Sequence, residues 1–177
     1  MVNVLLGLGS NRSFNGKEPV SLLKEACLSL RTILKDIRFS SIYKSAAMYY
    51  LNQEDFYNMA VTGKYEGSAF ELLDDIHKIE ETYGRDRKKE IRNGPRPIDI
   101  DIELFGSMKI NSPSLIIPHE RMLERAFVLM PAIEILEENA DVSKKDIEFY
   151  KKKLFSIKNQ QQINLYLSKE EFFFINS

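Results

Sequence analysis

Three acidic residues, Asp99, Asp101 and Glu103, alternate with aliphatic residues over the stretch 98–104. In an extended chain, alternate side chains point to opposite faces. We therefore expect the acids to share one face and the aliphatic side chains, including Leu104, to share the other. Asp99 and Asp101 would have Cα atoms about 7 Å apart, close enough to hold one or two hard divalent ions. Mg²⁺ is the expected metal, because it binds through one or two carboxylates together with substrate phosphates.

The segment before the acidic strand is strongly basic. Its basic residues within 85–96 are Arg85, Arg87, Lys88, Lys89, Arg92 and Arg96. If this segment folds back beside the acids, its arginines and a bound metal could together stabilise phosphate charge, as phosphoryl transfer requires. Arg96, directly before the strand, is the best placed of them, and Arg85 is the next.

The same residues also allow interpretations without catalysis. Charge runs in loops are usually solvated, and an exposed acidic strand that is salt-bridged to a basic loop would show this pattern. Glu103 either assists the metal site or is solvated. His119 is either a ligand-binding residue or a turn histidine that caps a helix. Cys27 is expected to pack inside a helix, because the sequence offers it no base.

Common nucleotide and zinc motifs are incomplete in this chain. Gly7 and Gly9 are followed by Arg12 where a dinucleotide-binding fingerprint requires glycine. His119 begins a zinc-protease pattern, but Leu123 stands where the second histidine is needed. With two histidines and one cysteine in the whole chain, the sequence argues against a zinc site.

The composition indicates one globular domain. The chain has 177 residues, of which 44% are hydrophobic and 29% charged, enough for one substantial core. A net charge of −1 gives no basic excess for nucleic acid. The first residues contain neither a basic leader nor a long apolar run, so we expect a cytoplasmic protein without a membrane segment. We also expect a monomer that acts on small molecules.

Hydrophobic periodicity predicts a β-α-β-β-α-β order around the acidic strand. The predicted elements are strands at 2–8, 37–43 and 59–65 and helices at 19–35 and 68–84. Ser68 and Glu71 would form a capping box at the start of the second helix, and Gly84 suits its end. This order predicts a ferredoxin-like α+β sandwich, in which two helices cover one face of a mainly antiparallel sheet.

The last part of the chain adds further elements. After the acidic strand we expect a short strand, a turn at Pro118 and helical segments that restart at Pro131. We expect residues 1–140 to form the main domain and residues 141–177 a C-terminal helical extension of the same domain. A Lys-rich helix begins this extension at Ser143, and a strand-like stretch follows. The run Phe172–Phe174 is expected to pack on this domain or on a partner.

Four motifs together resemble one enzyme family. They are GLGSN at 7–11, FYNMAV at 56–61, GPRPIDIDI at 94–102 and IPHERMLERAFVLMP at 117–131. In this order and spacing they resemble the 6-hydroxymethyl-7,8-dihydropterin pyrophosphokinases of folate biosynthesis, over about residues 1–140. The resemblance implies a ferredoxin-like fold. It also implies a diphosphokinase that moves pyrophosphate from ATP to the hydroxymethyl group of the pterin and releases AMP.

The resemblance further implies roles for individual residues. Asp99 and Asp101 would hold two Mg²⁺ ions that bind with ATP, and Arg96 and Arg85 match catalytic arginines. The residues implied on the nucleotide side are Glu80, Arg87, Arg96, His119 and Arg125. Those implied around the pterin are Asn58 as its hydrogen-bonding partner, Phe56 and Phe127 as its aromatic wall, and Ser45, Ala46 and Met48 as pocket lining.

The sequence leaves two alternatives to this function. Another Mg²⁺-dependent nucleotidyltransferase could place Asp-x-Asp on a ferredoxin-like sheet, although Asn58 and the segment 119–127 would then need a different explanation. A non-catalytic ligand-binding module of the same fold would have no need of acids that face arginines. Asn93, directly before the GPR motif, departs from the aromatic residue that is usual in the family.

Overall fold

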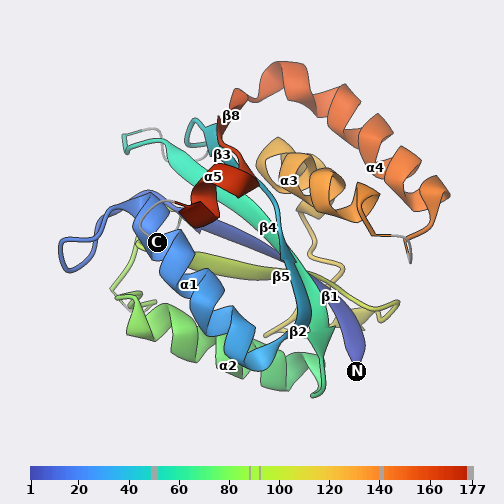
Figure 1. Ribbon diagram of the computed structural model, residues 1–177, viewed down its shortest axis with the longest axis horizontal. Helices are drawn as coiled ribbons and strands as arrows, with labels where there is room; N and C mark the ends of the chain where they lie inside the picture. The colour runs from blue at the N-terminus through green and yellow to red at the C-terminus, as the bar shows by residue number, and fades with distance from the viewer. Residues whose placement is uncertain (49–51, 88, 92, 140–141, 175–177) are drawn as a thin grey trace.

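The computed structural model describes residues 1–48, 52–87, 89–91, 93–139 and 142–174. The first seven elements are β1 (Val2–Ser10), α1 (Pro19–Ile33), β2 (Lys35–Phe39), β3 (Ile42–Ser45), β4 (Phe56–Tyr65), α2 (Ala69–Thr82) and β5 (Asp99–Phe105). The main sheet has the order β5-β1-β4-β3-β8, in which β8 is Ile163–Leu167, and β2 also pairs with β4 (Figure 1). All of these pairings are antiparallel. The predicted ferredoxin-like α+β sandwich is confirmed.

Helices α1 and α2 cover one face of the sheet, as predicted (Figure 1). Leu30 of α1 and Ile76 of α2 are fully buried in the core between these helices and the sheet. Cys27 lies in the same core, with its Sγ 3.6 Å from Met59 Sδ. Burial raises the pKa of the Cys27 thiol, so this residue has the packing environment expected for it.

Helix α3 (Ala126–Glu137) covers the opposite face, to which the sequence analysis had assigned no element. Leu129 and Ala132 of α3 form a second core with Leu5 of β1 and Ala60 of β4. Helix α4 (Lys144–Ile157) lies against α3 on the side away from the sheet (Figure 1). The middle of the sheet is therefore buried on both faces.

Pro131 does not restart a helix, so this prediction was wrong. Helix α3 runs unbroken through Pro131, although proline has no N–H to donate to the carbonyl of Phe127. Such an interruption costs about 3 kcal/mol. The neighbours Leu129, Ile133 and Ile135 are buried, and each stabilises the helix by about 1.5–3 kcal/mol. Tertiary burial thus outweighs the local preference of proline.

The predicted strand at 37–43 is divided in two. Phe39 of β2 lies opposite Val61, but Tyr43 of β3 lies opposite Asn58, so the register shifts by one residue between them. Ser40 occupies this irregularity: its N–H donates to the Ala60 carbonyl, and its Oγ accepts the Ala60 N–H at 2.9 Å. Its hydroxyl thus takes the place of a backbone carbonyl in the pairing with β4.

Strand β5 contains a bulge at Glu103. After this bulge, the side chains point to the opposite face of the sheet from the one that strict alternation predicts. Leu6 of β1 pairs with Ile102 and Leu5 pairs with Leu104, so Glu103 has no partner on β1. Ile102 packs on the α1 and α2 side, whereas Leu104 packs on the α3 side. The prediction that Leu104 shares a face with Ile102 was therefore wrong.

Two short strands and a 3₁₀ turn connect β5 to α3. The predicted strand before Pro118 is β7 (Ile116–Ile117), which pairs with β6 (Ile110–Asn111). The Ile117–Pro118 peptide bond is cis. The 3₁₀ turn η1 (Met122–Glu124) then leads into α3.

The C-terminal extension contains the Lys-rich helix and the strand-like stretch that the sequence predicts. After α4 and the 3₁₀ turn η2 (Lys158–Gln160), strand β8 (Ile163–Leu167) pairs with β3 at the edge of the main sheet. Helix α5 (Lys169–Phe174) follows, and Phe172 is buried in the core beneath α1 and α2. Of the run Phe172–Phe174, the side chains after Phe172 lie outside the described residues.

In the part of the chain that the structure describes, none of the helices is both long enough and apolar enough to span a bilayer.

Ser68→Ala should destabilise the protein by about 1 kcal/mol, because it removes the hydroxyl that accepts the Glu71 N–H and leaves only the backbone half of the capping box. Its Oγ accepts the Glu71 N–H at 3.2 Å, and its own N–H donates to the Glu71 carboxylate at 2.8 Å. Urea denaturation measures the loss. Ser68→Asp, which keeps an acceptor at the cap, is the matched control and should retain most of the stability. Equal losses in the two variants would contradict the capping role.

Candidate active site

A cavity of about 280 Å³ brings together every site residue expected from the sequence except Glu80. Its wall is formed by β1, β4 and β5, by the end of β3, by the basic segment before β5 and by the start of α3. Residues that are far apart in the chain therefore face one space.

Two glycines leave the acidic face of β5 open. Gly7 and Gly9 of β1 lie directly opposite the two aspartates of β5, and both line the cavity. A Cβ on Gly7 would come within 2.9 Å of a carboxylate oxygen of Glu103. The lack of side chains at these positions thus makes room for the carboxylates and for a ligand beside them.

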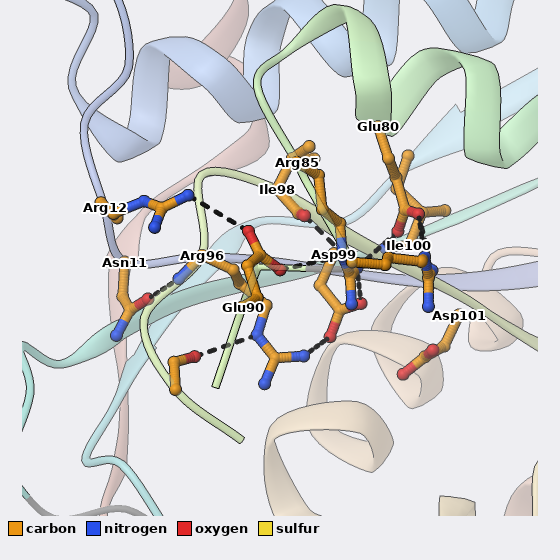
Figure 2. A network of polar contacts seen from close by, with 12 residues as sticks. Asn11, Arg12, Glu80, Arg85, Glu90, Arg96, Ile98, Asp99, Ile100 and Asp101 are labelled. Carbon is orange, nitrogen blue, oxygen red and sulfur yellow. Dashed lines mark hydrogen bonds and ion pairs between the residues drawn. The ribbon is translucent and has the colours of Figure 1, made fainter. Parts of the chain in front are cut away.

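Asp99 lies between two arginines. Its two carboxylate oxygens accept hydrogen bonds from Arg85 and Arg96 (Figure 2). Burial would raise the pKa of Asp99, but the positive charges of Arg85 and Arg96 outweigh it and hold that pKa below its usual value. The basic segment has therefore folded back beside the acidic strand.

Asp101 has weaker charge compensation than Asp99. Its Oδ2 lies 3.6 Å from Nη1 of Arg125, at the start of α3. Burial and the neighbouring charge of Asp99 raise the pKa of Asp101 to about 7, and Arg125 only partly opposes them. Additional positive charge at this point of the cavity would stabilise the ionised form of Asp101.

Glu103 is not solvated, which rules out one of the two interpretations of this residue. Its side chain is 1% exposed, and in the described chain neither of its carboxylate oxygens has a hydrogen-bond partner. Burial and the charge of Asp101 raise the pKa of Glu103 well above its usual value. Burial thus favours the protonated form of this carboxyl group over the ionised form.

His119 lies beside Glu103 on the cavity wall. Its Nδ1 is 3.9 Å from a Glu103 carboxylate oxygen and accepts the Arg121 N–H at 3.3 Å. Burial and the charge of Arg125 lower the pKa of His119, so the ring is neutral at pH 7. Because Nδ1 is an acceptor, Nε2 carries the proton and can donate to a ligand.

Glu80 lies beneath the arginines and not on the cavity wall. Its carboxylate accepts hydrogen bonds from Arg85 and Arg87, both at 2.6 Å, and from the Ile100 N–H at 2.8 Å. Burial raises the pKa of Glu80, and the charge of Arg85 opposes this shift. In this position Glu80 orients the two arginines through ion pairs, with Arg85 directed to Asp99 (Figure 2).

A second set of lining residues is neutral and comes from β3, β4 and the chain after β3. Asn58 is 4% exposed, and its Nδ2 donates to Ser45 Oγ at 2.9 Å. Ala46 and Met48 follow Ser45 on the wall. The Asn58 side-chain oxygen faces Gly9, since a Cβ on that glycine would lie 3.4 Å from it.

Two aromatic rings also line the cavity, and each carries an arginine over its face. The Cζ of Arg96 lies 5.8 Å from the centre of the Phe56 ring. The Cζ of Arg125 lies 5.7 Å from the centre of the Phe127 ring. The aromatic and cationic parts of the site are therefore in direct contact.

Asn11 is a site residue to which the sequence analysis gave no role. Its Oδ1 accepts the Arg96 N–H at 2.9 Å (Figure 2), and its Nδ2 donates to the side chain of Gln53 at 3.0 Å. Gln53 in turn donates to the Asn93 carbonyl at 3.0 Å. Asn11 thus fixes the backbone of Arg96. Its place at the end of the GLGSN motif was the available signal.

Comparison with known proteins identifies the family. The family model described as 7,8-dihydro-6-hydroxymethylpterin-pyrophosphokinase matches residues 5–137. The chain belongs to this pyrophosphokinase family. A pyrophosphokinase of Bacillus subtilis, named for 2-amino-4-hydroxy-6-hydroxymethyldihydropteridine, is 36% identical over 154 residues, which are 84% of this chain and 90% of that protein. The family expected from the motifs is confirmed.

Other relatives of this pyrophosphokinase family are longer proteins. The mitochondrial folate synthesis bifunctional protein of Arabidopsis thaliana is 40% identical over 141 residues, which cover 78% of this chain but 24% of that protein. The wild-type HPPK-DHPS structure of Plasmodium falciparum matches with a TM-score of 0.62 at 18% identity, over 90% of this chain and 46% of that one. This structural match supports the ferredoxin-like fold.

Glu103→Gln should change how stability depends on pH. Because the folded pKa of Glu103 lies above the unfolded value of about 4.3, the folded state holds the extra proton between these two pKa values. The stability that this proton contributes is full below about pH 4 and is lost as pH rises through the folded pKa. We therefore expect the variant to gain stability relative to the parent protein as pH rises.

Urea denaturation from pH 4 to 8 in metal-free buffer tests this expectation. Glu81→Gln makes the same change at an exposed position of α2 and serves as the control. Parallel stability profiles for Glu103→Gln and the parent protein would contradict the raised pKa of Glu103.

Proposed function

We propose that this chain transfers the pyrophosphoryl group of ATP to the hydroxymethyl oxygen of 6-hydroxymethyl-7,8-dihydropterin, with release of AMP, in folate biosynthesis. The observation that carries the proposal is one cavity lined by two chemically different sets of residues. Asp99 and Asp101 stand among arginines, whereas Asn58 stands among aromatic and small side chains. A triphosphate and a flat heterocycle require these two environments.

The triphosphate would bind to the cationic set. Arg87 and Arg125 supply positive charge, and His119 supplies an N–H donor from its neutral ring. In the described contacts, Arg96 uses Nη1 for Asp99 and Nε for the Gly94 carbonyl, which leaves Nη2 for a phosphate oxygen. Glu80 would not contact the triphosphate and would orient Arg87 through their ion pair.

The pterin would bind to the neutral set. A side-chain amide offers both a donor and an acceptor, which suits the edge of a pterin ring, and Asn58 is held by Ser45. Phe56 and Phe127 would contact the faces of the ring. Ala46 and Met48 would close the pocket on the side where β3 ends.

The carboxylates fit Mg²⁺ ions that arrive with ATP. In the described part of the chain, no group of three or more His, Cys, Asp or Glu side chains could hold an ion alone, so substrate oxygens would complete the coordination. Asp99 and Asp101 would hold two ions, and bound ions would neutralise phosphate charge. The repulsion that raises the pKa of Asp101 would be relieved in the same way.

The transfer itself would depend on alignment and charge. The hydroxymethyl oxygen forms a bond to the β-phosphorus, while the bond from the β-phosphorus to the oxygen that bridges to the α-phosphorus breaks. Arg85 and Arg96 lie on either side of Asp99 and would stabilise the charge of the moving group.

An assay with ATP, Mg²⁺ and the hydroxymethyl dihydropterin tests the function directly. AMP and the pterin diphosphate should form in equal amounts. The 6-methyl dihydropterin, which lacks the attacking hydroxyl, is the matched control and should yield no AMP. Formation of ADP, or of AMP with the control pterin, would contradict the proposal.

Asp101→Asn should lower turnover by on the order of 100-fold or more, because a metal ligand loses its charge. The fold should survive, since the substitution also removes repulsion from Asp99. Asp74→Asn makes the same change at an exposed position of α2 and should leave turnover unaltered. Near-normal Mg²⁺-dependent turnover of Asp101→Asn would rule out the metal role.

Arg96→Ala should slow the chemical step by about 100-fold and weaken pterin binding much less, because its charge acts on the phosphoryl group in transit. Single-turnover kinetics and pterin titration separate these two effects. Arg31→Ala, on the exposed side of α1, is the control. Weakened pterin affinity with an unchanged chemical rate would place Arg96 in the wrong part of the site.

Three broader features belong to the same proposal. We infer that the enzyme works as a cytoplasmic monomer on two small-molecule substrates, without nucleic acid or membrane. We also infer that residues 1–140 form the pyrophosphokinase domain and that residues 141–177 extend it. The pairing of β8 with β3 supports this division, because it joins the extension to the main sheet.

A further inference from the structure

The side chain of Gln161, in the C-terminal extension, forms hydrogen bonds to the backbone on both sides of Arg125. Its Oε1 accepts the Ala126 N–H, and its Nε2 donates to the Glu124 carbonyl, both at 2.7 Å. Arg125 itself is the N-cap of α3 and makes no side-chain capping bond. The first N–H of α3, which has no partner within the helix, is therefore satisfied by a side chain 35 residues further along the chain.

These two hydrogen bonds matter for the position of Arg125, because the Arg125 side chain itself makes few polar contacts. In the described chain its buried Nε has no hydrogen-bond partner, and its Nη1 is 3.6 Å from Asp101. Its guanidinium also lies over the face of Phe127, two residues along. The backbone at residues 124–126 therefore sets where the guanidinium lies in the cavity.

Two residues after Gln161, the chain reaches the opposite wall. Ile163 pairs with Ser45 at the end of β3, and Ser45 Oγ accepts the hydrogen bond from Asn58. Without β8, strand β3 would be the edge of the sheet next to the pocket. The short segment 161–163 thus joins the start of α3 to the end of β3, which carry residues of the cationic and neutral sets respectively.

The segment is anchored at both of its ends. Before it, Ile147 of α4 is buried in the core that contains α3. After it, the Lys169 N–H donates to Ser41 Oγ at 3.1 Å, and Phe172 is buried in the main core. All of these extension residues lie beyond the family-matched region 5–137.

We propose that Gln161 is a positioning residue of the active site, and that the segment 161–163 holds the two walls of the cavity at the separation that the substrates require. The inference rests on the proposed function for its kinetic consequences. Gln161 touches no substrate. It acts by fixing Arg125 and Phe127 through the backbone, so that the extension contributes to catalysis from outside the family-matched region.

The test compares three variants of the full chain. Gln161→Ala removes both hydrogen bonds, Gln161→Met removes them while keeping the length of the side chain, and Gln162→Ala changes the exposed neighbour. In the AMP-forming assay, both Gln161 variants should show a higher KM for ATP and a kcat/KM lower by about tenfold. Gln162→Ala should stay within about twofold of the parent protein.

A second readout does not depend on turnover. Hydrogen exchange of the Ala126 and Phe127 amides should accelerate by about tenfold or more in the Gln161 variants, because the first turn of α3 loses its cap. A merely structural role would lower the melting temperature and leave kcat/KM unchanged in the folded protein. That result, or equal kinetics for the Gln161 and Gln162 variants, would overturn the inference.

The two readouts separate the two proposals. If the parent protein forms no AMP with the pterin, the proposed function fails. In that case the exchange rates test the structural part of the inference, that Gln161 fixes the first turn of α3: unchanged exchange at Ala126 and Phe127 in Gln161→Ala overturns it, and accelerated exchange supports it.

Discussion

Repulsion among the carboxylates of β5 is the constraint around which the site is built. Asp99, Asp101 and Glu103 enter one partly dehydrated cavity, where like charges interact more strongly than in water. Each is accommodated differently: Asp99 lies beside two guanidinium groups, Asp101 lies beside one, and Glu103 lies beside none and has a raised pKa. The positive groups come from the loop before the strand and from the start of α3, so these segments must meet β5 for the charges of the aspartates to be compensated.

The fold accommodates the carboxylates in two ways: arginines provide positive charge beside them, and glycines of β1 leave space opposite them. Gly7 and Gly9 remove side chains from the strand that faces the aspartates. Glu80 accepts a hydrogen bond from the Arg85 side chain, and Asn11 accepts one from the Arg96 backbone N–H, so both arginines are fixed in position. The same arginines that compensate the acids stand where a triphosphate would bind, so compensation in the free protein and ligand recognition use the same groups.

Local patterns predicted the elements, and long-range contacts decided what the patterns could not. The capping box at Ser68 and the alternation of Asp99 and Asp101 were predictable, because each involves neighbours in sequence. The bulge at Glu103 depends on its register with β1, and the unbroken helix at Pro131 depends on burial against the sheet. Only the family resemblance suggested that Asn58 and Arg125 share a site, since they lie on separate elements. Gln161 matched no motif.

The burial of Phe172 has a consequence for synthesis of the protein in the cell. A ribosome makes the chain from its N-terminus, so the sheet strands and α1 emerge before β8 and α5 exist. Until Phe172 has left the exit tunnel, the core under α1 has an unfilled space and β3 presents an unpaired edge. The nascent domain is therefore open to wrong pairing with other chains during that interval, and a chain that stops short of β8 would keep that exposed edge.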